Sequence, residues 1–459
     1  MKLFSLRLTT LKSKLYAIVL ASFVVRVVAF FALPNSASNL APDEGTYANL
    51  AQWIGMSKPA TDFPVYGEML YLSGRALILP SALFYKLGFN SLDAVRLTAS
   101  IYGLLTLIAV AILTYSLFSH VKNRKKKRDH LIISLMLLFA FLPSPLVWST
   151  LGLRESATTF WVMFGFMIFF LITQRKVKNV NSSHLLLIIS IVMVFSSRPQ
   201  VGWVFAVTLI FYTIFFRKTR LVLIPILLIS VFIGYLGSTP KNEIKVITYS
   251  VSSPSGINVE QSKAVECSRD GQVLQLNGQK LVCKKKIVTK INPGYALAKE
   301  IESIDYHREA NQVGAASVIE TIPCPVNVET NTDKYFCMAY RAPYMTFSFL
   351  SRPTLGADVT SSSSLVAAAE NIFWLVAFIF VIVMFVRNRK LAFLGALTPS
   401  LVFFSLYTVG AGAYEGNMGT AFRHKSLILW VVLLLIASTI VATQQRKAER
   451  EGISGSSQE

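Results

Sequence analysis

Residues 93–128 read DAVRLTASIYGLLTLIAVAILTYSLFSHVKNRKKKR, a long apolar run that ends in a cluster of Lys and Arg. A membrane-spanning helix needs about 20 predominantly apolar residues, and Lys and Arg gather at its cytoplasmic end. The pattern recurs along a chain of 459 residues, of which 53% are hydrophobic and only 15% charged. The sequence therefore predicts an integral membrane protein with many spans. Because the net charge of +21 sits largely in clusters between apolar runs, we expect membrane lipids and no nucleic acid as partners.

The apolar runs predict about ten transmembrane helices, at the usual length of about 20 residues each. The expected spans are 15–33, 93–117, 131–148, 157–172, 184–195, 201–216, 221–236, 365–386, 391–409 and 427–441. Arg26 interrupts the first run and no small-residue cleavage site clearly follows, so we interpret it as an uncleaved span. The basic clusters place both termini in the cytoplasm of a multi-pass plasma (inner) membrane protein, although an endoplasmic-reticulum membrane with a luminal site satisfies the same rules.

These boundaries predict an all-α polytopic fold with four parts. Residues 1–236 form an N-terminal membrane module of seven spans, whose long first outer loop, 34–92, carries candidate catalytic residues. Residues 237–364 form a small outer domain with some β structure, because β-branched residues alternate there with turn signals. Residues 365–443 form a C-terminal module of three spans, and 444–459 form a disordered cytoplasmic tail.

All four cysteines of the chain fall within the second outer segment. They are Cys267, Cys283, Cys324 and Cys337. An even number of cysteines on the outer side of a membrane indicates one or two disulfides, with three possible pairings of the four. A zinc site is the weaker alternative, since no CxxC motif and no neighbouring His accompanies them.

Two acidic motifs are the candidates for catalysis. Asp43 and Glu44 follow the first span and precede Tyr47, and Glu155 follows Arg154 in the short turn before the fourth span. Ionisable residues at the ends of spans are costly in lipid and are therefore typical of functional sites. The alternative for Asp43 is a helix N-cap. We expect the acids from these two distant segments to meet at the same outer height.

Two basic motifs are the candidates for substrate binding. Arg198 stands in an outer turn, and the segment before the last span contains Asn417, Arg423, His424 and Lys425. Arginine binds phosphate and stabilises the charge on a departing group. A carboxylate within reach removes the proton of an attacking hydroxyl. For the basic residues the alternative is contact with lipid headgroups, which weighs most for Lys425.

The N-terminal half resembles the GT-C glycosyltransferases that use polyprenyl-phosphate sugars, including protein O-mannosyltransferases and lipid A aminoarabinose transferases. The resemblance rests on 43–48 (DEGTYA), on Gly88 followed by Ala94, Arg96 and Leu97, and on the acid Glu155. It implies that Asp43 is the catalytic base, that Glu44 orients the site and that Glu155 supports it. It also implies inversion at the sugar carbon, with a hydroxyl of a glycan, lipid or protein as acceptor in cell-envelope glycan assembly.

Three readings of function stay open on the sequence. The first is a lipid-phosphate-dependent sugar transferase, with Tyr47, Arg96 and Arg154 added to the substrate-binding set. The second is a surface polysaccharide (O-antigen-like) polymerase or ligase that uses lipid-diphosphate glycans, because 417–424 resembles such enzymes. The third is a lipid-linked sugar transporter or flippase. Mg²⁺ or Mn²⁺ at Asp43, Glu44 and Glu155 is a weak further expectation, and no metal site is assigned.

Overall fold

The computed structural model describes most of the helical part of the chain. The described residues are 10–33, 43–63, 67–118, 125–174, 179–216, 220–238, 249–252, 273–276, 279–285, 322–326, 330–356, 358–359, 362–387 and 398–450. Cys267 and residues 451–459 of the predicted tail lie outside them.

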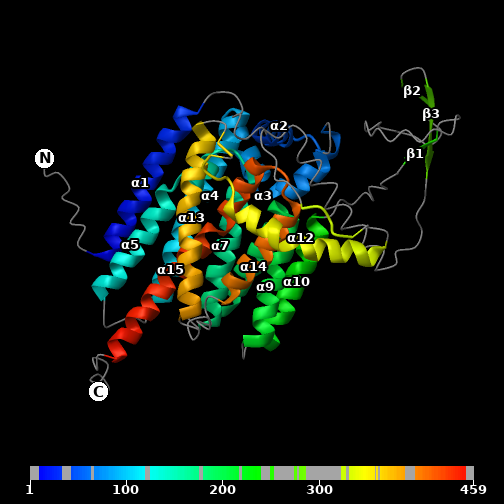
Figure 1. Ribbon diagram of the computed structural model, residues 1–459. Helices are drawn as coiled ribbons and strands as arrows, with labels where there is room; N and C mark the ends of the chain where they lie inside the picture. The colour runs from blue at the N-terminus through cyan, green and yellow to red at the C-terminus, as the bar shows by residue number, and fades with distance from the viewer. Residues whose placement is uncertain are drawn as a thin grey trace.

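The described part of the chain is predominantly helical (Figure 1). The α-helices are α1 (Leu11–Ala32), α2 (Asp43–Gly55), α3 (Gly67–Lys86), α4 (Ser91–Phe118), α5 (Lys125–Phe141), α6 (Pro143–Thr150), α7 (Arg154–Thr173), α8 (Val180–Ser197), α9 (Pro199–Phe216), α10 (Arg220–Ser238), α12 (Asn331–Ser351), α13 (Ser362–Arg387), α14 (Thr398–Tyr414) and α15 (Met418–Arg450), with a short 3₁₀ turn, η1, at Ala60–Asp62. Helices suit an apolar chain in lipid because each satisfies its own backbone hydrogen bonds.

Several helices are long and apolar enough to cross a membrane, as the composition predicts. Within the described residues, five helices are long and apolar enough to cross a membrane: α1, α4, α7, α8 and Gly419–Ala437 of α15. Shorter apolar helices cover Pro199–Ile214, Val222–Ser238 and Ser364–Phe380. The chain is therefore membrane-embedded by these criteria, and ten complete spans are not confirmed.

The expected third span, 131–148, contains a break. Its residues form α5 and α6, which bend by 48° at a break near Leu142. Pro143 opens α6, where its missing N–H costs nothing, and Pro145 follows in the same turn. The bend turns α6 toward α4, with which it packs.

The segment 34–92, expected as a long outer loop, is largely helical in its described residues. It contains α2, η1 and α3, and α2 packs against both α3 and α4. Tyr47, Leu50 and Leu77 lie in a buried apolar cluster that also includes residues of α4 and α7, so this segment packs onto those helices. The predicted C-terminal tail also begins later than expected, because α15 continues to Arg450 through residues that favour helix.

Three strands lie in the second outer segment. They are β1 (Tyr249–Ser252), β2 (Val273–Leu276) and β3 (Gln279–Lys285), in the order β1-β3-β2. Both pairings are antiparallel, with Val251 opposite Cys283 and Val273 opposite Val282. A disulfide-bonded domain around this sheet is not confirmed.

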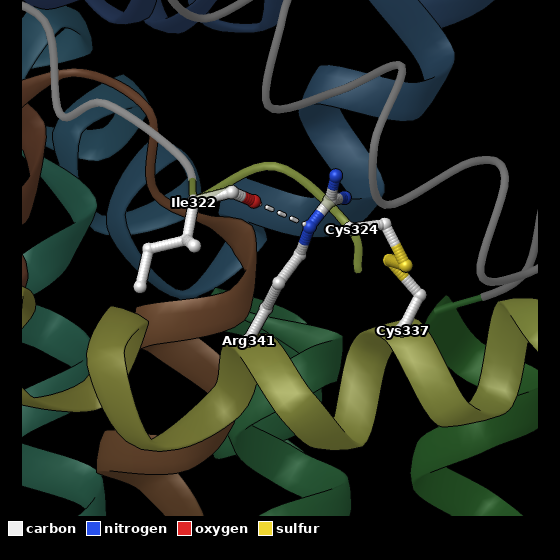
Figure 2. The surroundings of a disulfide bond; sticks show 4 residues. All are labelled: Ile322, Cys324, Cys337 and Arg341. Atoms are coloured by element: carbon white, nitrogen blue, oxygen red, sulfur yellow. Dashed lines mark hydrogen bonds between the residues drawn. A yellow bond between two sulfur atoms is a disulfide. The ribbon is translucent and has the colours of Figure 1, made fainter. Parts of the chain in front are cut away.

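One disulfide lies in the described residues, and it belongs to α12 (Figure 2). Cys337 in the second turn of α12 bonds to Cys324 in the preceding segment, with their Cα atoms 5.5 Å apart. One turn further on, Arg341 donates from Nε to the carbonyl of Ile322 at 2.8 Å. Two adjacent turns of α12 therefore hold the segment 322–326. In Figure 1 this helix lies across the bundle beside α14, against which it packs.

The membrane helices pack closely around aromatic side chains and small residues. Phe166 contacts the rings of Phe205, Phe403 and Trp430, which joins α7 to α9, α14 and α15. Beside this cluster, Gly165 leaves room for Ser190 on α8 and the ring of Phe205. Close helix approach through small residues is typical of membrane bundles.

We expect Gly165→Ala to destabilise the protein by about 1–3 kcal/mol, because the new methyl group would overlap Ser190 and Phe205. Gly410→Ala in α14 is the matched control, since a methyl group there meets no atom within 4 Å. Tryptophan fluorescence during unfolding in mixed SDS micelles measures both. Equal unfolding midpoints for the two variants would contradict the packing described for α7.

Candidate functional site

Charged side chains from four distant segments meet at the ends of the helices. Asp43 opens α2, Glu155 lies in the first turn of α7, and Arg198 joins α8 to α9. Arg423 and His424 follow in the second turn of α15. The structure therefore brings together five of the site residues that the sequence predicts.

Glu155 is the centre of this cluster. Its side chain is 2% exposed, and its Oε1 lies 3.1 Å from Nη2 of Arg198 and 3.2 Å from Nε of Arg423. Nε2 of His424 lies 3.5 Å from the same oxygen. A buried carboxylate is stable only when charge and hydrogen bonds compensate its lost hydration, and here three basic side chains do so.

Asp43 forms the solvent-facing edge of the cluster. Its Oδ2 accepts from Nη1 and Nη2 of Arg423, at 3.2 and 3.3 Å. The side chain of Asp43 is 54% exposed, whereas that of Arg423 is 11% exposed. Arg423 thus spans from a buried acid, Glu155, to an accessible one.

Glu415 is a member of the cluster that the sequence analysis does not name as a site residue. It lies between α14 and α15, where its Oε1 contacts Nδ1 of His424. Burial alone would raise the pKa of Glu415. The charge and hydrogen bond of the neighbouring His424 lower it by more, so that this pKa lies below its usual range. His424 therefore lies between two carboxylates, Glu155 and Glu415. An acid at the end of a helix, nine residues before His424, was the available signal.

Glu44 does not join this cluster, although it is adjacent to Asp43 in the chain. Its oxygens accept from Nε and Nη2 of Arg96 at 2.9 Å each, a bidentate pair. The backbone N–H of Gly152 also donates to Glu44 at 2.7 Å. A side chain at Gly152 would meet Val95 and Glu44, so glycine allows this close approach. The ion pair connects α2, α4 and the turn before α7, and thereby fixes the segments that carry Asp43 and Glu155.

The remaining predicted residues lie around the cluster. Tyr47 is buried, and burial raises the pKa of its phenol, which is therefore neutral near pH 7. Arg154 donates to the hydroxyl of Ser73 at 3.2 Å. Asn417 accepts from the backbone N–H of Gly419 at 2.9 Å and so stabilises the start of α15.

The alternative that Lys425 contacts lipid headgroups is wrong. The residue is 2% exposed, and its Nζ donates to the carbonyls of Leu350 and Arg352 and to Oδ1 of Asn371. These acceptors lie at the end of α12 and on α13. Lys425 therefore ties α15 to two neighbouring helices, immediately beyond Arg423 and His424.

The acids of this region do not form a metal-binding set. The part of the chain that the structure describes holds no group of three or more His, Cys, Asp or Glu suited to a metal ion. Glu44 faces Arg96, while Asp43 and Glu155 face Arg423. The donor set of these acids therefore does not fit the expected Mg²⁺ or Mn²⁺.

Comparison with known proteins adds no assignment. No family model, no curated protein and no solved structure matches the chain.

We expect Glu44→Gln to destabilise the protein by about 3–5 kcal/mol, because it removes the acid of a buried, bidentate ion pair with Arg96. The double variant Glu44→Met/Arg96→Met removes both charges and should recover most of that loss. Unfolding in mixed SDS micelles measures both variants, with Asp62→Asn, a substitution of an exposed acid, as control. Equal destabilisation by the single and double variants would show that the pair does not act as a unit.

Proposed function

We propose that the chain is an inverting membrane glycosyltransferase of the GT-C type, which moves a sugar from a polyprenyl-phosphate carrier to a hydroxyl acceptor. The observation that carries the proposal is the contact of the accessible Asp43 with Arg423, beside the buried Glu155. A candidate base and a candidate phosphate ligand are thus adjacent, at the end of a helix bundle with membrane-spanning character.

The two arginines suit the phosphate of such a donor. Arg198 and Arg423 converge on a single carboxylate oxygen, at 3.1 and 3.2 Å, so two guanidinium groups share one partner. A phosphate offers several oxygens to such planar donors. The departing phosphate gains negative charge during transfer, and fixed guanidinium groups stabilise it.

Asp43 suits the role of general base. In the reaction the acceptor oxygen bonds to the anomeric carbon, while the bond from that carbon to the phosphate oxygen breaks and its electron pair leaves with the phosphate. The hydroxyl proton passes to the carboxylate of Asp43. Single displacement inverts the anomeric carbon. A phosphate bound to Arg423 would compete with Asp43 for the guanidinium and so release the base beside the reacting centre.

The membrane arrangement that accompanies this proposal has about ten spans, both termini in the cytoplasm and the site on the outer face of a plasma membrane. The basic clusters at 122–128 and 217–220 favour the cytoplasm for those ends, as Lys and Arg do in short loops. The polyprenyl chain would remain in the bilayer while its phosphate reaches the cluster. Assembly of a cell-envelope glycan fits such a site.

A polysaccharide polymerase or ligase acting on lipid-diphosphate glycans is the second candidate. Its specific support is the convergence of Arg198 and Arg423, which suits a diphosphate as well as a monophosphate. This reading needs the arginines more than a carboxylate base.

We expect Asp43→Asn to lower sugar transfer by about 100- to 10,000-fold, the usual range for loss of a general base. Asp62→Asn, an exposed substitution in η1, should leave the rate unchanged. The assay follows label from polyprenyl-monophosphate sugars and from polyprenyl-diphosphate glycans to glycan, lipid and protein acceptors, with the full chain reconstituted in liposomes. Use of diphosphate glycans alone, with Asp43→Asn active and Arg423→Ala inactive, would replace the transferase by the polymerase.

A further inference from the structure

A small cavity is lined by Glu155 together with Arg26 of α1. It leaves about 30 Å³ for the centres of water molecules. Its walls come from α1, α4, α5, α6, α7 and α15, and the residues are Arg26, Gly103, Thr106, Phe139, Pro145, Trp148, Ser149, Glu155, Ser156, Thr159 and Ser426. One water molecule fills a probe sphere of about 10–15 Å³, so a cavity with this much room for water centres holds at least one.

Two polar atoms on residues of this wall lack hydrogen-bond partners among the described residues. One is Oε2 of Glu155, an acceptor on a residue that is 1% exposed. The other is the indole Nε1 of Trp148, a donor that is shielded from solvent. Two residues that line the same cavity thus carry an acceptor and a donor that are each costly to leave unsatisfied.

The rest of the wall decides which ligand fits. The hydroxyls of Thr106, Ser156 and Ser426 donate to backbone carbonyls of their own helices, at 2.7, 2.9 and 2.7 Å, and keep lone pairs as acceptors. The buried guanidinium of Arg26 disfavours a metal cation, and the carboxylate of Glu155 disfavours an anion. A small neutral molecule that both donates and accepts satisfies this set, and water is that molecule.

We propose that this cavity is a hydration site in which water bridges Nε1 of Trp148 and Oε2 of Glu155. Trp148 is then a positioning residue. Through water it holds Oε2 of Glu155, and Oε1 of the same carboxylate remains for Arg198, Arg423 and His424. Arg26, which donates to Ser149 at 3.1 Å, lines the same cavity. This inference stands apart from the proposed function, and its tests contain no sugar donor.

X-ray radiolytic labelling of the full chain in nanodiscs tests the hydration, because hydroxyl radicals form from bound water inside a protein. We expect several-fold faster oxidation of Phe139, a buried residue of the cavity wall, than of Phe195, which is equally buried and lines no such space. Thr106→Ile, which extends into the cavity, should reduce labelling of Phe139 to the level of Phe195. Thr114→Ile is the matched control, because Thr114 is buried on the same helix and makes the same backbone bond. Equal oxidation of Phe139 and Phe195 in the wild type would show a dry cavity and overturn the proposal.

Infrared spectroscopy tests the bridge itself. The carboxylate band of Glu155 is the one lost in Glu155→Gln, and we expect Trp148→Phe and Thr106→Ile to shift it, because both disturb the bridging water. Trp161→Phe is the control for Trp148→Phe, because it removes an indole from α7 that does not line the cavity. Thr114→Ile is again the control for Thr106→Ile. Neither control should move the Glu155 band. An unmoved Glu155 band in Trp148→Phe would overturn the positioning role of Trp148, even with water present.

Discussion

The arrangement of the site depends on one buried carboxylate. Glu155 lies at the start of α7, and a single one of its oxygens faces basic side chains from the α8–α9 turn and from α15. A carboxylate in such surroundings must be compensated, and each of the cations needs the acid in return. The ends of these helices are therefore held together by charge, where the helices themselves pack through apolar and aromatic contacts. This mutual need explains why residues separated by more than 200 positions occupy one small volume.

The ion pair of Glu44 and Arg96 supports the cluster around Glu155 but is not part of it. Glu44 and Arg96 are both fully buried and joined by two hydrogen bonds, and Gly152 adds a third from the turn that leads into α7. Because that turn is fixed, Glu155 begins its helix at a defined place relative to Asp43. Lys425 acts similarly on the other side, where it ties α15 to the end of α12 and to Asn371. The cluster thus lies between two buried polar anchors.

The sequence predicts the class of fold and most members of the cluster, because both follow from local signals. Apolar runs indicate membrane helices, and ionisable residues at their ends indicate a site. What it does not predict is the partner of each residue. Asp43 and Glu44 are neighbours of the same type, yet one faces Arg423 across the site and the other faces Arg96 on α4. Glu415 and the burial of Lys425 were missed for the same reason, since each depends on a helix that only the tertiary structure brings near. The break between α5 and α6 was signalled by two prolines, but its 48° bend was not.

The exposure of Asp43 distinguishes it from every other acid of the cluster. Glu155 and Glu415 are buried and lie against His424, and Glu155 also lies against two arginines, so basic side chains hold both acids without a ligand. Asp43 is half exposed and meets the cluster only through the tip of Arg423. Among these acids it is the one that a substrate can reach without unpacking a helix. Nε of Arg423 lies against the buried Glu155, whereas Nη1 and Nη2 lie against the exposed Asp43. The two Nη atoms can therefore exchange Asp43 for another acceptor while Nε remains in place. In the proposed transferase, donor phosphate and acceptor hydroxyl therefore meet at the same exposed edge, and the buried acids serve to hold the arginine there.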